Sequence, residues 1–302
     1  MTFLTCQALA SPATGATGVS SSFGTFGELA QGALPGRNGD FLITLPVAHW
    51  SAATFRYQAG SDEVRVSPAH KSKARHLAQS MLRRSAIGGG GLLDLTSTLP
   101  EGKGMASSSA DLVATARAVA NALGLRLRPS GIENLIRPIE PTDGVMYPGI
   151  VSFDHRRVRL RGRLGSLPSL TILGLDEGGS VDTVAFNQLE KPFSVSDRRY
   201  YEHVLDSMAL AIAGRDLRTV GRLATASAEL NQQLCPKRTL TPMREICDDV
   251  GALGVVAAHS GTMLGLLLDP DEPSYRSRLA DALRACAGLS GSVALYRSLS
   301  FE

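Results

Sequence analysis

The chain has 302 residues, of which 43% are hydrophobic and 20% are charged, and its formal net charge is +3. This composition excludes disordered and fibrous proteins and allows one large or two ordinary globular domains. The mild charge does not indicate a nucleic-acid partner, no apolar run approaches the roughly 20 residues of a membrane-spanning helix, and the four dispersed cysteines suit a reducing compartment. We therefore expect a cytoplasmic protein without a nucleic-acid or membrane partner.

The first half of the chain begins with residues 1–20, which are small and polar and lack the basic start and apolar run of a signal peptide, so we expect a flexible tail. Hydrophobic periodicity then predicts strands at 41–47, 52–57, 63–66 and 92–97 and helices at 71–84, 112–123 and 130–137. Gly124 marks the end of the long second helix. The third helix begins with Ser130 and Glu133 at the spacing of a capping box.

The second half continues the mixture of strands and helices. We expect strands at 170–175, 255–258, 263–268 and 292–296 and helices at 197–213, 217–234, 241–253 and 274–287. Thr241 followed by proline is a good helix start. The order predicts the α+β class, with an N-terminal domain over 21–165 and a C-terminal domain over 166–302.

The strongest chemical signal lies between the strand at 92–97 and the long helix. The segment reads Pro100-Glu101-Gly102-Lys103-Gly104-Met105-Ala106-Ser107-Ser108-Ser109. A strand that runs into small residues and then a helix leaves backbone N–H groups unpaired at the positive end of the helix dipole, where a polyphosphate can approach. A serine hydroxyl on the first turn could reach a phosphate or its Mg²⁺. A serine-rich helix cap without a ligand is the alternative; the segment is neither a Walker A loop nor a dinucleotide-binding fingerprint.

Three motifs, in this order, resemble those of the GHMP kinases, the family of galactose, homoserine, mevalonate and phosphomevalonate kinases. They are Phe26-Gly27-Glu28-Leu29-Ala30-Gln31-Gly32, the segment from Pro100 to Ala110, and Ala258-His259-Ser260-Gly261-Thr262-Met263-Leu264-Gly265. Together with Glu140-Pro141-Thr142-Asp143, they are similar to the L-threonine kinase branch, whose product, O-phospho-L-threonine, feeds the aminopropanol linker of cobalamin. The resemblance implies a ribosomal S5 domain 2-like N-terminal domain, a ferredoxin-like C-terminal domain, and ATP-dependent phosphorylation with Mg²⁺.

The resemblance also implies roles for single residues. The phosphates would contact Pro100, Lys103, Gly104, Met105, Ala106, Ser107, Ser108 and Ser109. Ser108 aligns with the serine that contacts Mg²⁺ in the family; Glu140 is the expected carboxylate partner, and Glu133 is the alternative. Asp143 is the candidate base, although an aspartate before glycine also forms turns. Lys103 could equally be a solvated loop lysine.

The acceptor substrate is expected to contact Glu28, Asp143, His259, Ser260 and Gly261, with structural roles as alternatives for Glu28 and His259. Two departures weaken the match, because Phe23 stands where the family has proline and the third motif has only two glycines. We expect a small hydroxyl-bearing amino acid as substrate, L-threonine ahead of homoserine, serine or a related alcohol, and a monomer or homodimer. A GHMP-fold protein that binds nucleotide without turnover is the rival, whereas a serine hydrolase is excluded because the chain has no Gly-x-Ser-x-Gly.

Overall fold

The computed structural model describes residues 13–36, 39–85, 87–181, 186, 189–289 and 291–301. The strands are β1 (Thr17–Ala33), β2 (Asp40–Gln58), β3 (Val64–Ser67), β4 (Gly90–Ser97), β5 (Ile150–Asp154), β6 (Arg159–Gly165), β7 (Thr171–Asp176), β8 (Gly254–Ala257), β9 (Met263–Leu268) and β10 (Ser292–Arg297). The helices are α1 (Ser72–Arg84), α2 (Ser107–Ala122), α3 (Pro129–Ile136), α5 (Val195–Ala213), α6 (Leu217–Leu230), α7 (Leu240–Val250) and α8 (Tyr275–Cys286), and a short 3₁₀ helix follows α6 at Asn231–Gln233.

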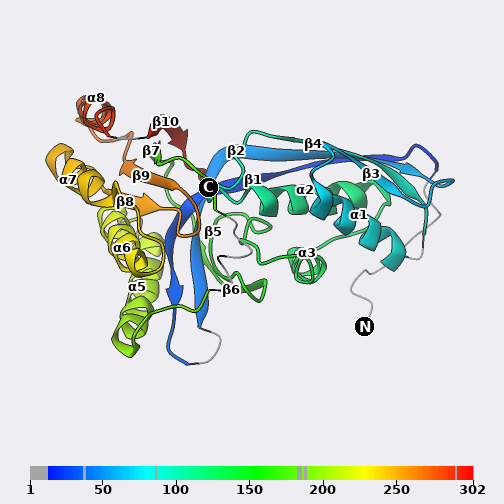
Figure 1. Ribbon diagram of the computed structural model, residues 1–302, viewed down its shortest axis with the longest axis horizontal. Helices are drawn as coiled ribbons and strands as arrows, with labels where there is room; N and C mark the ends of the chain where they lie inside the picture. The colour runs from blue at the N-terminus through cyan, green and yellow to red at the C-terminus, as the bar shows by residue number, and fades with distance from the viewer. Residues whose placement is uncertain are drawn as a thin grey trace.

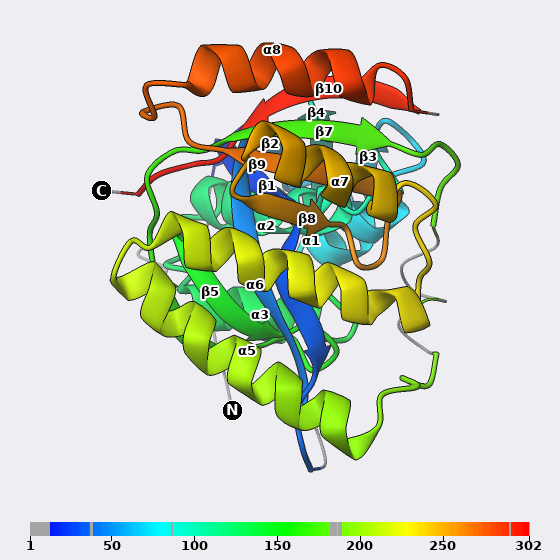
Figure 2. The same ribbon diagram turned by 90° about the vertical axis from the view of Figure 1, so that its left-hand side faces the viewer.

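These strands form one curled sheet in the order β10-β7-β9-β8-β1-β2-β4-β3, with β5 and β6 branching from β2. Figure 1 shows α1, α2 and α3 against one end of the sheet, and Figure 2 shows α5 to α8 as a layer over the other end. The α+β class is therefore confirmed, and the antiparallel strands β7 to β10 under their helices make the expected two-layer C-terminal half. The boundary near residue 165 stays a prediction.

The long strands β1 and β2 join the two halves. They pair antiparallel along most of their length, and β1 changes register between Thr25 and Ala30. At Glu28, within this irregular stretch, β1 also pairs with Ala257 of β8. Such irregularities bend a strand and re-aim its side chains. The first motif therefore lies where the sheet passes from one half of the molecule to the other.

Two predictions for the first half of the chain were wrong, one for the tail and one for a break between two strands. The expected tail overlaps β1, which begins at Thr17; residues 1–12 lie outside the described part. The small residues of this stretch have a packing role, since a Cβ on Gly18 would lie 2.1 Å from the carbonyl oxygen of Ala118 in α2. The strands expected at 41–47 and 52–57 are one strand, because Val47 before the interval and Trp50 and Ser51 within it pair with β1.

Two helix starts also differ from prediction. The N-cap of α3 is Arg128 without a side-chain bond, so Ser130 and Glu133 form no capping box. Helix α7 begins at Leu240, because Thr239 donates through both its backbone N–H and its hydroxyl to Glu177 Oε1, at 2.7 Å each. A tertiary contact therefore sets the start of α7. Among the residues described, no helix has the length and apolar character needed to cross a bilayer.

Candidate active site

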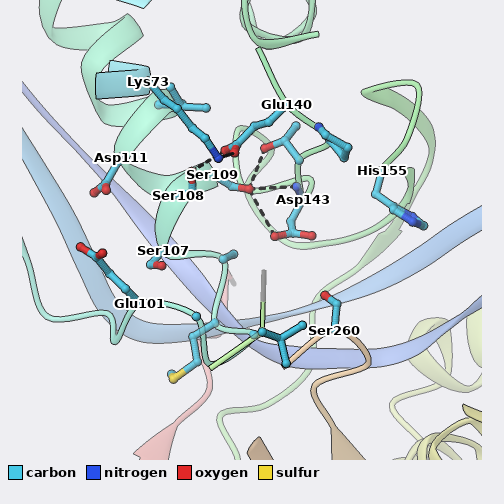
Figure 3. Close-up of a pocket in the computed structure, with 18 of the residues that line it drawn as sticks. Lys73, Glu101, Ser107, Ser108, Ser109, Asp111, Glu140, Asp143, His155 and Ser260 are labelled. Carbon is cyan, nitrogen blue, oxygen red and sulfur yellow. Dashed lines mark hydrogen bonds and ion pairs between the residues drawn. The ribbon is translucent and has the colours of Figure 1, made fainter. Parts of the chain in front are cut away.

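A cavity of about 320 Å³ opens between the start of α2, the start of α1 and the loop that follows α3 (Figure 3). Most of the predicted site residues line it: Glu28, Gly104, Met105, Ala106, Ser107, Ser108, Ser109, Glu140, Asp143 and Ser260. Four of them are not among its lining residues: Pro100, Lys103, His259 and Gly261. The structure thus brings the three motifs together around one space, although they are far apart in the chain.

The start of α2 presents backbone amides to this cavity. Its N-cap residue, Ala106, has the left-handed conformation (φ 56°, ψ 29°), and no side chain caps the first turn. A non-glycine residue in this region is strained, and such strain gathers at ligand sites. The first amides of α2 are therefore available to an anion at the positive end of the helix dipole.

The loop between β8 and β9, which contains the first residues of the third motif, packs behind the loop at 100–106, which we call the phosphate loop after its expected ligand. A Cβ on Gly104 would lie 2.4 Å from the Cβ of Ala258, and a Cβ on Gly261 would lie 2.2 Å from the carbonyl oxygen of Lys103. The N–H of Thr262 donates to the same oxygen at 3.2 Å. The glycines of the second and third motifs thus allow the two loops to touch, and the contact of Gly261 with the substrate stays a prediction.

The lysine of the phosphate loop turns away from the cavity. Lys103 Nζ lies 2.7 Å from Asp176 Oδ2 and donates to the carbonyl oxygen of Gly179 at 2.6 Å. Asp176 also accepts a bond from the hydroxyl of Thr262 at 2.6 Å. Lys103 therefore anchors the loop to the end of β7, and its contact with the phosphates stays a prediction.

The first pair of candidate catalytic groups is Ser108 and Glu140. The hydroxyl of Ser108 donates to Glu140 Oε1 at 2.5 Å, and the ammonium group of Lys73 donates to the other carboxylate oxygen (Figure 3). Glu140 is only 7% exposed. A buried carboxylate requires such partners to remain ionised.

The alternative carboxylate, Glu133, has a structural role. It accepts bonds from the hydroxyl of Tyr147 and the backbone N–H of Leu160, both at 2.8 Å, and it does not line the cavity. Both bonds tie α3 to neighbouring segments. The geometry therefore separates the two glutamates in favour of Glu140.

The second pair is Ser109 and Asp143. Ser109 Oγ accepts bonds from the hydroxyl of Thr142 (2.7 Å) and the N–H of Asp143 (3.1 Å), and it donates to Asp143 Oδ2 at 3.3 Å. Burial, together with the charges of Glu28 and Glu140, raises the pKa of Asp143 to about 7, and the bond from Ser109 opposes this rise. A carboxylate with a pKa near neutrality suits a general base.

Glu28 is fixed in position by contacts with His259. Its Oε2 accepts a bond from the N–H of His259 at 3.0 Å and lies 3.1 Å from His259 Nδ1. His259 Nε2 lies 3.0 Å from the hydroxyl of Ser227 in α6, and the ring is 1% exposed. His259 therefore positions Glu28, which favours the structural alternative, and its substrate contact stays a prediction. Ser260 does face the cavity (Figure 3).

A buried lysine holds the same loop from the other side. Lys237 is 6% exposed, its ammonium group donates to the carbonyl oxygen of Gly261, and it lies 3.1 Å from Cys235 Sγ. A buried ammonium group must have such partners. Lys237 thus links the segment after α6 to the loop that supports the phosphate loop.

Sequence reasoning did not find the polar groups at the α1 side of the cavity. Lys71 Nζ lies 2.6 Å from Asp111 Oδ2 and 2.6 Å from Glu101 Oε1, and the hydroxyl of Ser51 donates to the other oxygen of Asp111 at 2.5 Å. Lys73 lies beside them. Two signals could have indicated them: lysines at a helix start oppose the helix dipole, and Asp111 interrupts the apolar face of α2.

Comparison with known proteins gives a consistent result. The sequence model for the GHMP kinases N terminal domain matches residues 72–147, and that for the GHMP kinases C terminal matches 208–289, together more than half of the chain.

Two relatives are similar in sequence. The chain is 28% identical over 244 residues to the L-threonine kinase of Citrobacter freundii, with 80% of this chain and 83% of that one aligned. It is 30% identical over 178 residues to the L-threonine kinase of Salmonella typhimurium, with 59% of each aligned. In structure, the homoserine kinase of Cytophaga hutchinsonii aligns with a TM-score of 0.74 at 16% identity, over 94% of this chain and 95% of that one, so the two share a fold.

Proposed function

The chain belongs to the GHMP kinases and is an ATP-dependent kinase, and from this premise we propose that it phosphorylates the side-chain hydroxyl of L-threonine. The observation that carries this proposal is the placement of the Ser108–Glu140 pair beside the Ser109–Asp143 pair in one cavity at the start of α2. The first pair offers a hydroxyl and a carboxylate oxygen to a metal ion. The second pair offers a carboxylate that can act as a base. The two relatives that are L-threonine kinases favour threonine as the acceptor.

Ser108 and Glu140 are suited to Mg²⁺. This ion prefers oxygen ligands and is usually bound by one or two carboxylates together with substrate phosphates and water. A hydroxyl group and a carboxylate in contact beside the phosphate loop supply such oxygens. When bound, the ion would neutralise part of the charge that spreads over the transferred phosphoryl group.

Asp143 acts as the base in the proposed reaction. Its carboxylate accepts the proton of the threonine hydroxyl, whose oxygen bonds to the γ-phosphorus of ATP while the bond to the β–γ bridging oxygen breaks. ADP leaves, and Asp143 is left protonated. Ser109 fixes the carboxylate, since it bonds both the side chain and the backbone N–H of Asp143. The amides at the start of α2 hold the phosphates in line.

Glu28 would select an amino acid over a neutral alcohol. It lines the same cavity as Asp143, and its charge is close enough to raise the pKa of Asp143. Two buried carboxylates in one space favour a ligand that brings a positive charge. The ammonium group of an amino acid meets this demand at the end of the cavity where the hydroxyl must lie.

An acceptor screen with labelled ATP and Mg²⁺ tests the proposal. We expect the highest kcat/KM with L-threonine, lower values with serine and homoserine, and a loss of at least about 100-fold with simple alcohols. N-acetyl-L-threonine is the matched control, because it keeps the hydroxyl and carboxylate but lacks the ammonium group. Magnesium-dependent ATP binding without transfer to any acceptor would contradict the proposal and favour a non-catalytic nucleotide-binding protein. The cytoplasmic location, the monomer or homodimer, and the cobalamin link stay predictions.

A further inference from the structure

Lys73 occupies a position that the proposed reaction does not explain. It lies in the first turn of α1, lines the cavity, and places its ammonium group on Glu140 Oε2 (Figure 3). Ser108 occupies the other oxygen of the same carboxylate. Both oxygens of Glu140, the proposed metal ligand, therefore have a hydrogen-bond donor from the chain itself.

Helix stability does not account for this lysine. A positive charge in the first turn opposes the helix dipole, and no acidic residue in that turn compensates. Lys71, two residues earlier, differs because it is paired with Asp111, which is 4% exposed. The side chain of Lys73 is 45% exposed, against 5% for that of Glu140. Lys73 thus extends from solvent to reach a buried anion.

We propose that Lys73 bonds the Glu140 carboxylate in the metal-free protein and that its ammonium group moves to bond the triphosphate when Mg²⁺ and ATP bind. This inference rests on the metal-binding role proposed above for Ser108 and Glu140. In the free protein, the ammonium group of Lys73 bonds the buried carboxylate and fixes its orientation. A lysine has three donors on a flexible chain, so it can change partners without a change in the backbone.

The exchange follows from charge. An ammonium group and a divalent cation repel each other when they share one carboxylate, and the half-exposed lysine is the group that can leave at low cost. Its nearest new anion is the triphosphate, because the start of α2 lines the same cavity as Lys73. Lys73 would therefore compete with Mg²⁺ for Glu140 and cooperate with it on ATP.

The competition for Glu140 and the cooperation on ATP predict that substitution of Lys73 weakens binding of Mg²⁺-ATP but strengthens binding of Mg²⁺. Removal of the ammonium group should weaken binding of Mg²⁺-ATP about tenfold, since a hydrogen bond to a charged group is lost. The same substitution should lower the Mg²⁺ concentration for half-saturation, because a competing cation has gone. AMP, which lacks the β- and γ-phosphates, should bind within about twofold of its affinity for the unchanged protein.

The test is calorimetric titration of the full chain and of Lys73→Met with ATP, ADP and AMP, each over a range of Mg²⁺ concentrations. Arg75→Met is the matched control: it removes a positive charge two residues further along the same helix, outside this cavity, and should leave every affinity unchanged. Lys73→Arg should recover most of the ATP affinity. Circular dichroism checks that each variant is folded, and Lys73→Gln replaces Lys73→Met if that variant is not.

Three outcomes decide the inference. A weaker affinity for ATP, with AMP unaffected and a lower Mg²⁺ requirement, supports it. Unchanged ATP affinity in Lys73→Met overturns it, as does an equal loss for ATP and AMP, which would indicate a change in the shape of the pocket. If the unchanged protein shows no magnesium-dependent ATP binding, the proposed metal role of Ser108 and Glu140 is what has failed.

Discussion

The two ends of the cavity are built in different ways. At the α1 end, Lys71 already neutralises Asp111, and Lys103 behind the phosphate loop already neutralises Asp176. At the acceptor end, the carboxylate of Asp143 is bonded by the hydroxyl of Ser109, and that of Glu28 by the backbone N–H and the imidazole group of His259. The carboxylates at the nucleotide end are therefore already paired with lysines before ligands bind. The carboxylates at the acceptor end are stabilised most by a ligand that brings positive charge.

The largest effect should come from Asp143→Asn, which removes the base at the acceptor end. We expect kcat to fall about 1,000-fold, since an amide cannot accept the proton, while the affinity for ATP stays within about twofold. A coupled assay and ATP titration measure the two quantities. A kcat within tenfold of the unchanged enzyme would show that Asp143 is not the base.

The same substitution should stabilise the ligand-free protein. A raised pKa means that the folded state binds the proton more tightly than the unfolded chain, so stability is lost as pH rises from about 4 to the folded pKa of about 7. The amide side chain of the variant carries no charge to bury, and the melting temperature of Asp143→Asn should exceed that of the unchanged protein at pH 8. The two melting temperatures should converge at about pH 4.

Glu140→Gln and Ser108→Ala come next. Each removes one proposed metal ligand, and we expect kcat to fall about 100-fold, with a higher Mg²⁺ concentration for half-maximal activity. Ser107→Ala separates loss of a metal ligand from loss of a phosphate contact, because Ser107 lines the same cavity but has no bond to Glu140 or Asp143 in Figure 3, so its Mg²⁺ requirement should not change. Full activity at ordinary Mg²⁺ in either variant would remove that residue from the metal site.

Glu28→Gln should have a smaller effect that sharpens the contrast between the ends. The KM for threonine should rise about tenfold, because the ammonium group loses its ion pair. Asp143 must be ionised to act, so kcat/KM of the unchanged enzyme should rise with pH to a plateau above about 7. Since the charge of Glu28 helps to raise that pKa, the limb should move to lower pH in the variant. A pH profile that does not move would contradict this electrostatic coupling.

Lys237→Met should give the smallest change in activity. It leaves the carbonyl oxygen of Gly261 unsatisfied, which costs about 1–3 kcal/mol and lowers the melting temperature by several degrees. The KM for ATP should rise a few-fold, because the loop between β8 and β9 supports the phosphate loop. Thermal unfolding and steady-state kinetics measure both. An equal rise in the KM for threonine would place the effect at the acceptor end instead.

The sequence predicted the class, the long helix α2 and the position of the phosphate loop, because these depend on local periodicity and on small residues before a helix. It paired Ser108 with Glu140 through the family resemblance, but it did not predict the contact of Lys73 with Glu140, since these two residues lie 67 positions apart along the chain. His259 resembled a substrate contact because nothing in the neighbouring sequence reveals that its ring bonds Ser227. The strand β1 was not predicted, because glycine is unfavourable in strands and Gly18 there serves a close contact with α2.

The strands β1 and β2 leave the molecule without a place where it could be cut into two independent pieces. A fragment that ends at residue 165 would keep both strands but lose β8, the partner of Glu28, and the α5 and α6 side chains that cover Phe41 and Leu29. It would expose apolar surface and an open strand edge, the features that lead to aggregation. Because β1 and β2 run through both halves, we expect any movement of the halves during turnover to flex this shared ribbon.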